Sequence, residues 1–122
     1  MIVIAEAGTV WAHWNYDDRM RLVLQHARAA AAAAADIFKV QMFVPDQPLF
    51  CPVDGDERRW ERWKNTLISL DHWRQIKWIC EAELHIEFMA SAFQTEAVQW
   101  LKELGVKRYK VASRAIETFP YE

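Results

Sequence analysis

The sequence predicts an α/β fold with parallel strands, and two features support this prediction. Short, continuously apolar runs, typical of strands covered on both faces, alternate with longer amphipathic runs typical of helices. Two segments that close apolar runs, at residues 38–41 and 109–113, each carry a lysine near the strand end with a polar residue two or three positions later. Ligand-binding groups of α/β proteins gather at the carboxyl ends of parallel strands, and a lysine in a buried strand is costly unless it meets an anion. The pattern therefore predicts a site for a small, doubly charged anionic substrate.

The first third of the chain predicts a strand, a long helix and a second strand. Residues 2–5 form a short apolar run, which predicts the first strand. Asp17 and Asp18 are suited to the start of a helix whose apolar side comes from positions 20–27. Because alanine is the best helix former, we expect the helix to include the alanine run up to Ala35, with these alanines facing the sheet. Residues 37–43 then predict the second strand.

The middle of the chain predicts a long loop followed by two helices. Three prolines and Gly55 mark an extended segment at 45–55, and long loops in compact domains are usually functional or mobile. A charged, tryptophan-rich run at 57–65 predicts a short helix. Ser69 is suited to cap the next helix. We expect one side of that helix to carry Ile76, Ile79 and Cys80.

The last third predicts two more strands separated by a helix. The strands are expected at 86–90 and 106–112, and the helix at 95–104 with Gly105 as its C-terminal stop. Right-handed crossovers would place four parallel strands in sequential order. Repeated β/α units of this kind form a (β/α)8 TIM barrel, which typically needs about 250 residues. We therefore predict one domain, residues 1–122, that forms about half of a barrel and is truncated relative to a closed one, with a loop from Arg114 onward.

Composition excludes several classes of protein. A net charge of -2 and a pI near 6.1 do not give the excess of positive charge that is typical of nucleic-acid-binding proteins. No apolar run approaches the roughly 20 residues needed to span a bilayer. Cys51 and Cys80 form neither a metal motif nor a disulfide scaffold. We expect a cytoplasmic protein with reduced thiols. The seven tryptophans are interpreted as packing residues, with an interface as the alternative.

Four segments, each at a predicted strand end, resemble motifs of the N-acetylneuraminate (sialic acid) synthase family. In that family the motifs are A-E-x-G, V-K-x-Q, I-x-F-x-S-T-P-F and L-G-V-x-x-Y-K-I-A/G-S, and they occur here in the same order. The matching segments lie at residues 5–8, 38–41, 86–93 and 104–113. The resemblance covers essentially the whole chain and corresponds to the first half of the catalytic barrel.

The resemblance implies a metal-dependent transferase that condenses phosphoenolpyruvate with an N-acetylated amino sugar, giving a nonulosonic acid and phosphate. It implies catalytic roles for Glu6, beside the amino sugar, and for Lys110. Phosphoenolpyruvate carries a phosphate and a carboxylate, so cationic donors are needed. The implied substrate-binding residues are Lys39, Gln41, Ser91, Phe93 and Ser113. The divalent metal, manganese or magnesium, would be held by histidines outside this chain, so no metal ligand is predicted here.

Each assignment has a plainer alternative. Glu6 is nearly as well explained as a solvated strand-end carboxylate, and the two lysines as partners of local carboxylates. Phe93 suits loop packing better than substrate contact. Ser91 keeps the hydroxyl of the family's threonine, whereas Ala92 replaces its proline and loosens the loop. The segment 9–15 departs from the family's N-H-x-G pattern and is longer and richer in tryptophan.

Two other functions stay open at this point. A Schiff-base aldolase would use Lys39 or Lys110 to attack a ketone. A non-catalytic fragment would assemble with a partner through the open edges of its first and fourth strands. Those open edges also predict a homo-oligomer, and small molecules are the other expected partners.

Overall fold

The structure is a computed structural model and describes residues 1–44 and 57–112. The predicted loop at 45–55, the residue Ser113 and the tail from Arg114 lie outside the described residues.

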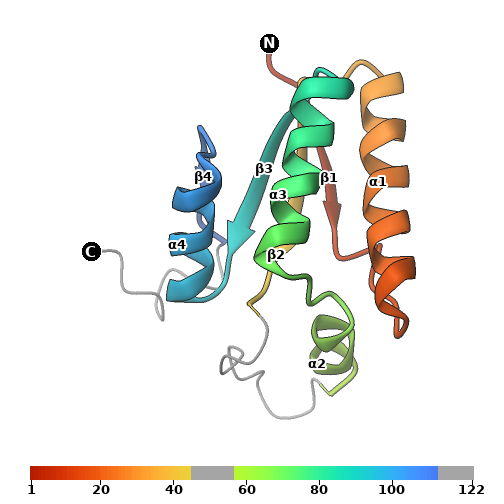
Figure 1. Cartoon of the computed structure of the whole chain (residues 1–122), viewed down its shortest axis with the longest axis vertical. Helices are drawn as coiled ribbons and strands as arrows, with labels where there is room; N and C mark the ends of the chain where they lie inside the picture. The colour runs from red at the N-terminus through yellow and green to blue at the C-terminus, as the bar shows by residue number, and fades with distance from the viewer. Residues whose placement is uncertain (45–56, 113–122) are drawn as a thin grey trace.

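Four parallel strands form the sheet (Figure 1). They are β1 (Ile4–Gly8), β2 (Ile37–Met42), β3 (Glu87–Ala92) and β4 (Tyr109–Lys110). Their order in the sheet is β1-β2-β3-β4, and every neighbouring pair is parallel. The sequential parallel sheet predicted from the alternation of elements is therefore confirmed for the described part of the chain.

Four α-helices connect or flank these strands. They are α1 (Tyr16–Ala32), α2 (Glu57–Lys64), α3 (Leu70–Trp78) and α4 (Thr95–Leu104), and α3 continues into a π-helical turn at Ile79–Glu83. The predicted cap of α3 is confirmed, because the Ser69 side chain accepts a hydrogen bond from the backbone N–H of His72. Gly105 ends α4 with a left-handed φ of 68°, as predicted. At α1 the capping residue is Asn15, whose side chain accepts a hydrogen bond from the N–H of Asp18, and the predicted Asp17 and Asp18 both lie in the first turn of the helix.

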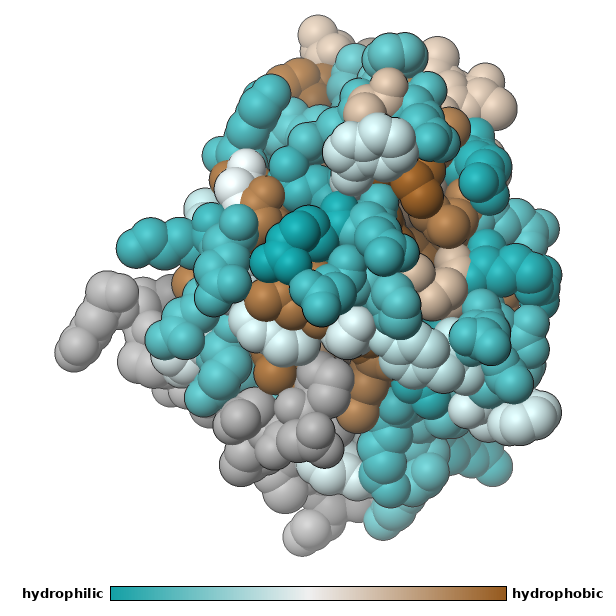
Figure 2. Space-filling model, in the orientation of Figure 1, coloured by the Kyte–Doolittle hydropathy of each residue, from teal (hydrophilic) through white to brown (hydrophobic). Residues whose placement is uncertain are grey.

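The helices α1, α3 and α4 lie on one side of the sheet, and α2 lies beyond the ends to which the strands point (Figure 1). The main core fills the space between these helices and the sheet. Its centre includes the fully buried Val23 of α1, Phe38 of β2 and Trp73 of α3. Figure 2 shows that the outer surface on this side is largely hydrophilic, with separate apolar patches. One face of the sheet is thus committed to the core, which leaves the other face for a site.

Three predicted element boundaries were wrong. The first strand begins at Ile4 and extends to Gly8, while Ile2 is 57% exposed. The helix α1 ends at Ala32, not at Ala35 as predicted. Ala34 adopts a φ of 58°, which is not helical, so the last part of the alanine run lies outside the helix. Within the run at 29–35 only Ala30 is buried. The fourth strand spans two residues, because Arg108 and its predecessors form the turn that follows α4.

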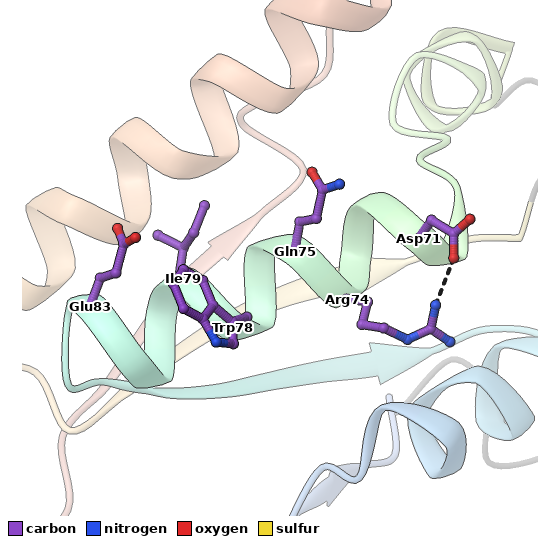
Figure 3. A pocket seen from close by; sticks show the side chains of 6 residues that line it. All are labelled: Asp71, Arg74, Gln75, Trp78, Ile79 and Glu83. Atoms are coloured by element: carbon purple, nitrogen blue, oxygen red, sulfur yellow. Dashed lines mark hydrogen bonds and ion pairs between the residues drawn. The ribbon is translucent and has the colours of Figure 1, made fainter.

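The seven tryptophans are buried to different degrees, with Trp60 and Trp100 partly buried against the core clusters, so the packing interpretation holds for only part of the set. Trp11, Trp63 and Trp73 are buried, whereas Trp14 and Trp78 are 77% and 60% exposed. A related error concerns α3. Ile76 and Cys80 are fully buried, but Ile79 is only half-buried and lines a surface depression together with Trp78 (Figure 3).

Candidate functional site

The strand register places five of the predicted site residues on one face of the sheet. Glu6 of β1 pairs with Lys39 of β2, and in the next layer Gln41 of β2 pairs with Ser91 of β3. Ser91 in turn pairs with Lys110 of β4. Side chains two residues apart on a strand share a face, and Lys39 and Gln41 are so spaced. The intervening residues Phe38 and Val40 belong to the helix-side core, so the five polar side chains lie on the face opposite the helices.

Lys39 and Glu6 form an ion pair on this face. The Lys39 ammonium donates to Glu6 Oε2, and the residue is buried, with 6% of its surface exposed. The Glu6 side chain is 46% exposed, and its Oε1 accepts a hydrogen bond of 2.8 Å from the backbone N–H of Gly8. Gly8 has a φ of 55°, which favours glycine, and the register of β1 shifts between Glu6 and Gly8. The glycine and the strand irregularity therefore hold the carboxylate against the buried ammonium.

Ser91 and Gln41 form the next layer toward the carboxyl end of the sheet. Ser91 is 3% exposed, so its hydroxyl lies inside the structure, and Gln41 is half-buried. Both side chains can donate to an anion without adding charge. Ser91 thus lies within β3, whose last residue is Ala92.

Lys110 is exposed, which corrects the expectation of a lysine in a buried strand. It occupies the edge strand, and its ammonium donates to the carbonyl oxygen of Val111. An edge lysine is free of the desolvation that acts on Lys39, so its position alone does not require an anion. Ser113, the polar partner expected beside it, lies outside the described residues.

Phe93 takes part in an aromatic cluster at the carboxyl end of the sheet. Its ring stacks on Phe43 at 4.9 Å and an interplanar angle of 17°, and Trp63 of α2 lies 5.1 Å from Phe43. Phe93 is 9% exposed. The cluster joins the ends of β2 and β3 to α2, which is the loop-packing role that the sequence offered as the alternative for Phe93.

Two polar residues near these strand ends were missed from the sequence. Gln94 is 6% exposed, and its Oε1 accepts a hydrogen bond of 2.7 Å from the N–H of Val44 just after β2. Arg19 donates to the carbonyl oxygens of His13 and Leu67 at 2.6 and 2.7 Å, so it ties the loop after β1 to the segment before α3. For Gln94 the only signal in the sequence was a polar residue shortly after an apolar strand, which is common in loops, and for Arg19, inside α1, there was no signal.

The described residues do not fit a divalent metal ion. Within residues 1–44 and 57–112 there is no group of three or more histidine, cysteine, aspartate or glutamate side chains that could hold one. His13 Nδ1 accepts from the N–H of Asn15, and His72 Nδ1 lies 2.7 Å from the hydroxyl of Tyr16. These histidines form hydrogen bonds in the segments around α1 and α3.

Across residues 1–44 and 57–112 no helix is both long enough and apolar enough to cross a membrane.

Comparison with known proteins identifies the family. The model of the NeuB family matches residues 26–121. This chain belongs to the NeuB family. The match covers three of the four motif segments, and it includes Lys39, Gln41, Ser91 and Lys110.

Two NeuB-type relatives extend the comparison. The N,N'-diacetyllegionaminic acid synthase of Legionella pneumophila is 29% identical over 129 aligned positions, which cover 98% of this chain and 35% of the relative. A crystal structure of the N-acetylneuraminic acid (sialic acid) synthetase of Leptospira borgpetersenii in complex with citrate has 25% identity and a TM-score of 0.68. That match covers 94% of this chain and 38% of the synthetase. The chain thus spans about a third of the length of these relatives and shares the fold of the matching part.

Proposed function

We propose that this chain forms the first half of a (β/α)8 barrel in a synthase that condenses phosphoenolpyruvate with an N-acetylated amino sugar. The observation that carries the proposal is the set of five polar side chains on the helix-free face of the sheet, in a chain of the NeuB family. In a closed barrel this face would line the interior, and strand-end residues on it would meet the substrate. One relative is named as an N,N'-diacetyllegionaminic acid synthase and the other as an N-acetylneuraminic acid (sialic acid) synthetase.

Phosphoenolpyruvate would bind between Lys39 and Lys110. Its phosphate and carboxylate each call for a cation, and Gln41 and Ser91 stand between the two lysines in the register of the sheet. Lys39 supports this role because it is a buried ammonium already paired with a carboxylate. A substrate anion would take the place of Glu6 on this ammonium. Ser113, three residues after Lys110 in the sequence, remains a proposed donor.

Glu6 would then act on the amino sugar. Its side chain is half-exposed, and one oxygen stays fixed by the N–H of Gly8 when the ammonium turns to the substrate. The freed oxygen can accept a hydroxyl hydrogen bond or a proton during the condensation, in which the methylene carbon of phosphoenolpyruvate bonds to the aldehyde carbon of the sugar, a water molecule adds at C2 of phosphoenolpyruvate, and phosphate leaves from C2. The family's divalent metal would be held by residues outside the described ranges. The roles proposed for Glu6 and the two lysines do not require contact with this metal.

The ion pair argues against Lys39, one of the two candidate lysines, as the nucleophile of the aldolase alternative. Imine formation requires a neutral amine with a free electron pair, and the amine of Lys39 is engaged with the carboxylate of Glu6. The Glu6–Lys39 ion pair is instead suited to a role in which a substrate anion replaces the Glu6 carboxylate on the Lys39 ammonium. The cytoplasmic location predicted from the sequence remains part of this proposal.

The test is a chimera in which this chain replaces the matching segment of the Leptospira synthetase. We expect the chimera to form sialic acid from phosphoenolpyruvate and N-acetylmannosamine, and the same chimera with Lys110→Ala to lose phosphoenolpyruvate binding. Circular dichroism and gel filtration establish that both chimeras are folded. A folded chimera that yields no product would contradict the proposed function.

A further inference from the structure

Arg19 of α1 joins two loops at the carboxyl end of the sheet. Its guanidinium donates to the carbonyl oxygens of His13 at 2.6 Å and Trp14 at 3.4 Å, both in the loop after β1. It also donates to the carbonyl oxygen of Leu67 at 2.7 Å, in the segment between α2 and α3. The three nitrogens of one planar group thus bind two segments that are far apart in the sequence. A lysine ammonium, a single point of charge on a flexible stem, does not reproduce this geometry.

The side chain of Arg19 is committed to these carbonyl groups. It is half-buried, and within residues 1–44 and 57–112 no carboxylate forms an ion pair with it. Burial lowers the pKa of the Arg19 guanidinium below its usual value, although the group remains charged. The guanidinium carbon lies 5.6 Å from the centre of the Tyr16 ring, and the Tyr16 hydroxyl accepts a 2.9 Å hydrogen bond from the N–H of Ser69. The first turn of α1 therefore contacts the segment before α3 at two points.

One of the two joined segments begins at the proposed site. Glu6 Oε1 accepts a hydrogen bond from the N–H of Gly8. Two consecutive turns follow within residues 7–12, and they are closed by backbone hydrogen bonds of 3.1 and 3.0 Å. His13 comes directly after these turns, and its N–H donates to the carbonyl oxygen of Asn65 at 3.0 Å. The backbone between the Glu6 carboxylate and the carbonyl groups that Arg19 binds is thus hydrogen-bonded along most of its length.

The other joined segment leads to α2, which lies beyond the strand ends (Figure 1). The hydroxyl and the N–H of Thr66 both donate to the carbonyl oxygen of Trp63, at 2.6 and 3.0 Å, so Leu67 is held close to the end of α2. Trp63 packs in the aromatic cluster with Phe43 and Phe93, which follow β2 and β3. The Leu67 carbonyl is therefore linked to the ends of the two strands that carry most of the proposed phosphoenolpyruvate site.

We propose that Arg19 is a positioning residue for the condensation: by joining the loop after β1 to the segment before α3, it fixes Glu6 relative to the polar residues of β2 and β3. The inference rests on the proposed function, because it assigns Arg19 an effect on the amino-sugar end of that site. Arg19 acts through the two loops and not on the substrate, since α1 lies on the helix side of the sheet. The loop that it holds belongs to segment 9–15, which departs from the family's N-H-x-G pattern, so the family resemblance does not assign this contact.

Two substitutions of Arg19 test this role in the chimera with the Leptospira synthetase. Arg19→Met removes all three donors. A misplacement of about 1 Å can cost about a hundredfold in rate, so we expect kcat/KM for N-acetylmannosamine to fall at least about tenfold while the KM for phosphoenolpyruvate stays unchanged. Arg19→Lys keeps the charge but should show the same loss, because one ammonium does not reach the carbonyl groups of both segments. Hydrogen exchange of the chain itself should become faster at the N–H groups of His13 and Ser69 in both variants and stay unchanged in β2.

The matched control is Arg21→Met on the same helix. Arg21 has an exposed side chain that pairs with Asp18, so its loss removes the same charge without touching either loop. We expect R21M to match the wild type in kinetics and in hydrogen exchange. Equal losses for both substrates in the Arg19 variants would make Arg19 a structural residue, and unchanged kinetics would remove it from the reaction, so either result overturns this inference alone. A folded but inactive wild-type chimera would overturn the proposed function and this inference with it.

Discussion

Replacement of Lys39 by methionine separates the binding role of this lysine from its role in stability. Lys39→Met removes the ammonium but keeps the length of the side chain, which is buried between neighbouring strands. The carboxylate of Glu6 loses its cation. It keeps the N–H of Gly8 at 2.8 Å and a side chain that is 46% exposed to water.

The structure sets the size of both effects. An ion pair with one half-exposed partner contributes on the order of 0–1 kcal/mol, and burial of methionine in place of an ammonium offsets part of that loss. We therefore expect the free energy of unfolding to change by less than about 1 kcal/mol. A charge-assisted hydrogen bond to the substrate contributes about 1.5–3 kcal/mol, which corresponds to a loss of roughly 10–150-fold in phosphoenolpyruvate affinity.

Urea unfolding and calorimetric titration with phosphoenolpyruvate measure the two quantities. Lys102→Met on α4 is the control, because Lys102 is exposed and the substitution removes the same charge. If Lys39→Met and Lys102→Met lose phosphoenolpyruvate affinity equally, the loss would be due to the change in net charge and not to a contact made by Lys39. A loss of stability above about 3 kcal/mol with unchanged affinity would refute the reasoning, since Lys39 would then be a structural ion-pair residue.

Further outcomes follow from the same structure. Lys110→Ala in the chimera should abolish phosphoenolpyruvate binding and leave the fold intact, because the lysine is exposed; calorimetry that detects unchanged affinity removes it from the site. Glu6→Gln should slow turnover with the amino sugar more than it weakens phosphoenolpyruvate binding, and steady-state kinetics with equal losses would make Glu6 structural. This chain alone should make no product even with manganese or magnesium, and a synthase assay that detects activity would contradict the half-barrel proposal. Burial raises the pKa of the Cys80 thiol from 9.0 to about 12, so the folded state favours the neutral thiol. Stability should therefore fall as the pH rises above about 9, and denaturant titrations of Cys80→Ala should show a smaller decline.

Local patterns in the sequence predicted the order and type of the elements well. The parallel sheet follows from alternating apolar and amphipathic runs, and the ends of α3 and α4 follow from Ser69 and Gly105. The ends of strands were less predictable where an apolar run extends beyond the residues that pair with the neighbouring strand. Ile2 and Val3 have strand-like side chains, yet β1 pairs with β2 only from Ile4 onward.

The site was predictable in composition but not in arrangement. Periodicity suggests that Glu6 and Lys39 lie at strand ends, but only the register shows that they pair. The exposure of Lys110 follows from its place on an edge strand, which no local pattern reveals. The exposure of Trp78 was equally unpredictable from the sequence, because a tryptophan on an amphipathic helix is ordinarily a core residue.

The central claim is that the helix-free face of the sheet binds phosphoenolpyruvate. Nuclear magnetic resonance of the labelled chain, titrated with millimolar phosphoenolpyruvate, tests this claim most directly. We predict that the resonances that shift belong to the residues around the Glu6–Lys39 pair and to Gln41, Ser91 and Lys110. Shifts confined to the helices, or no saturable shifts at all, would contradict the claim.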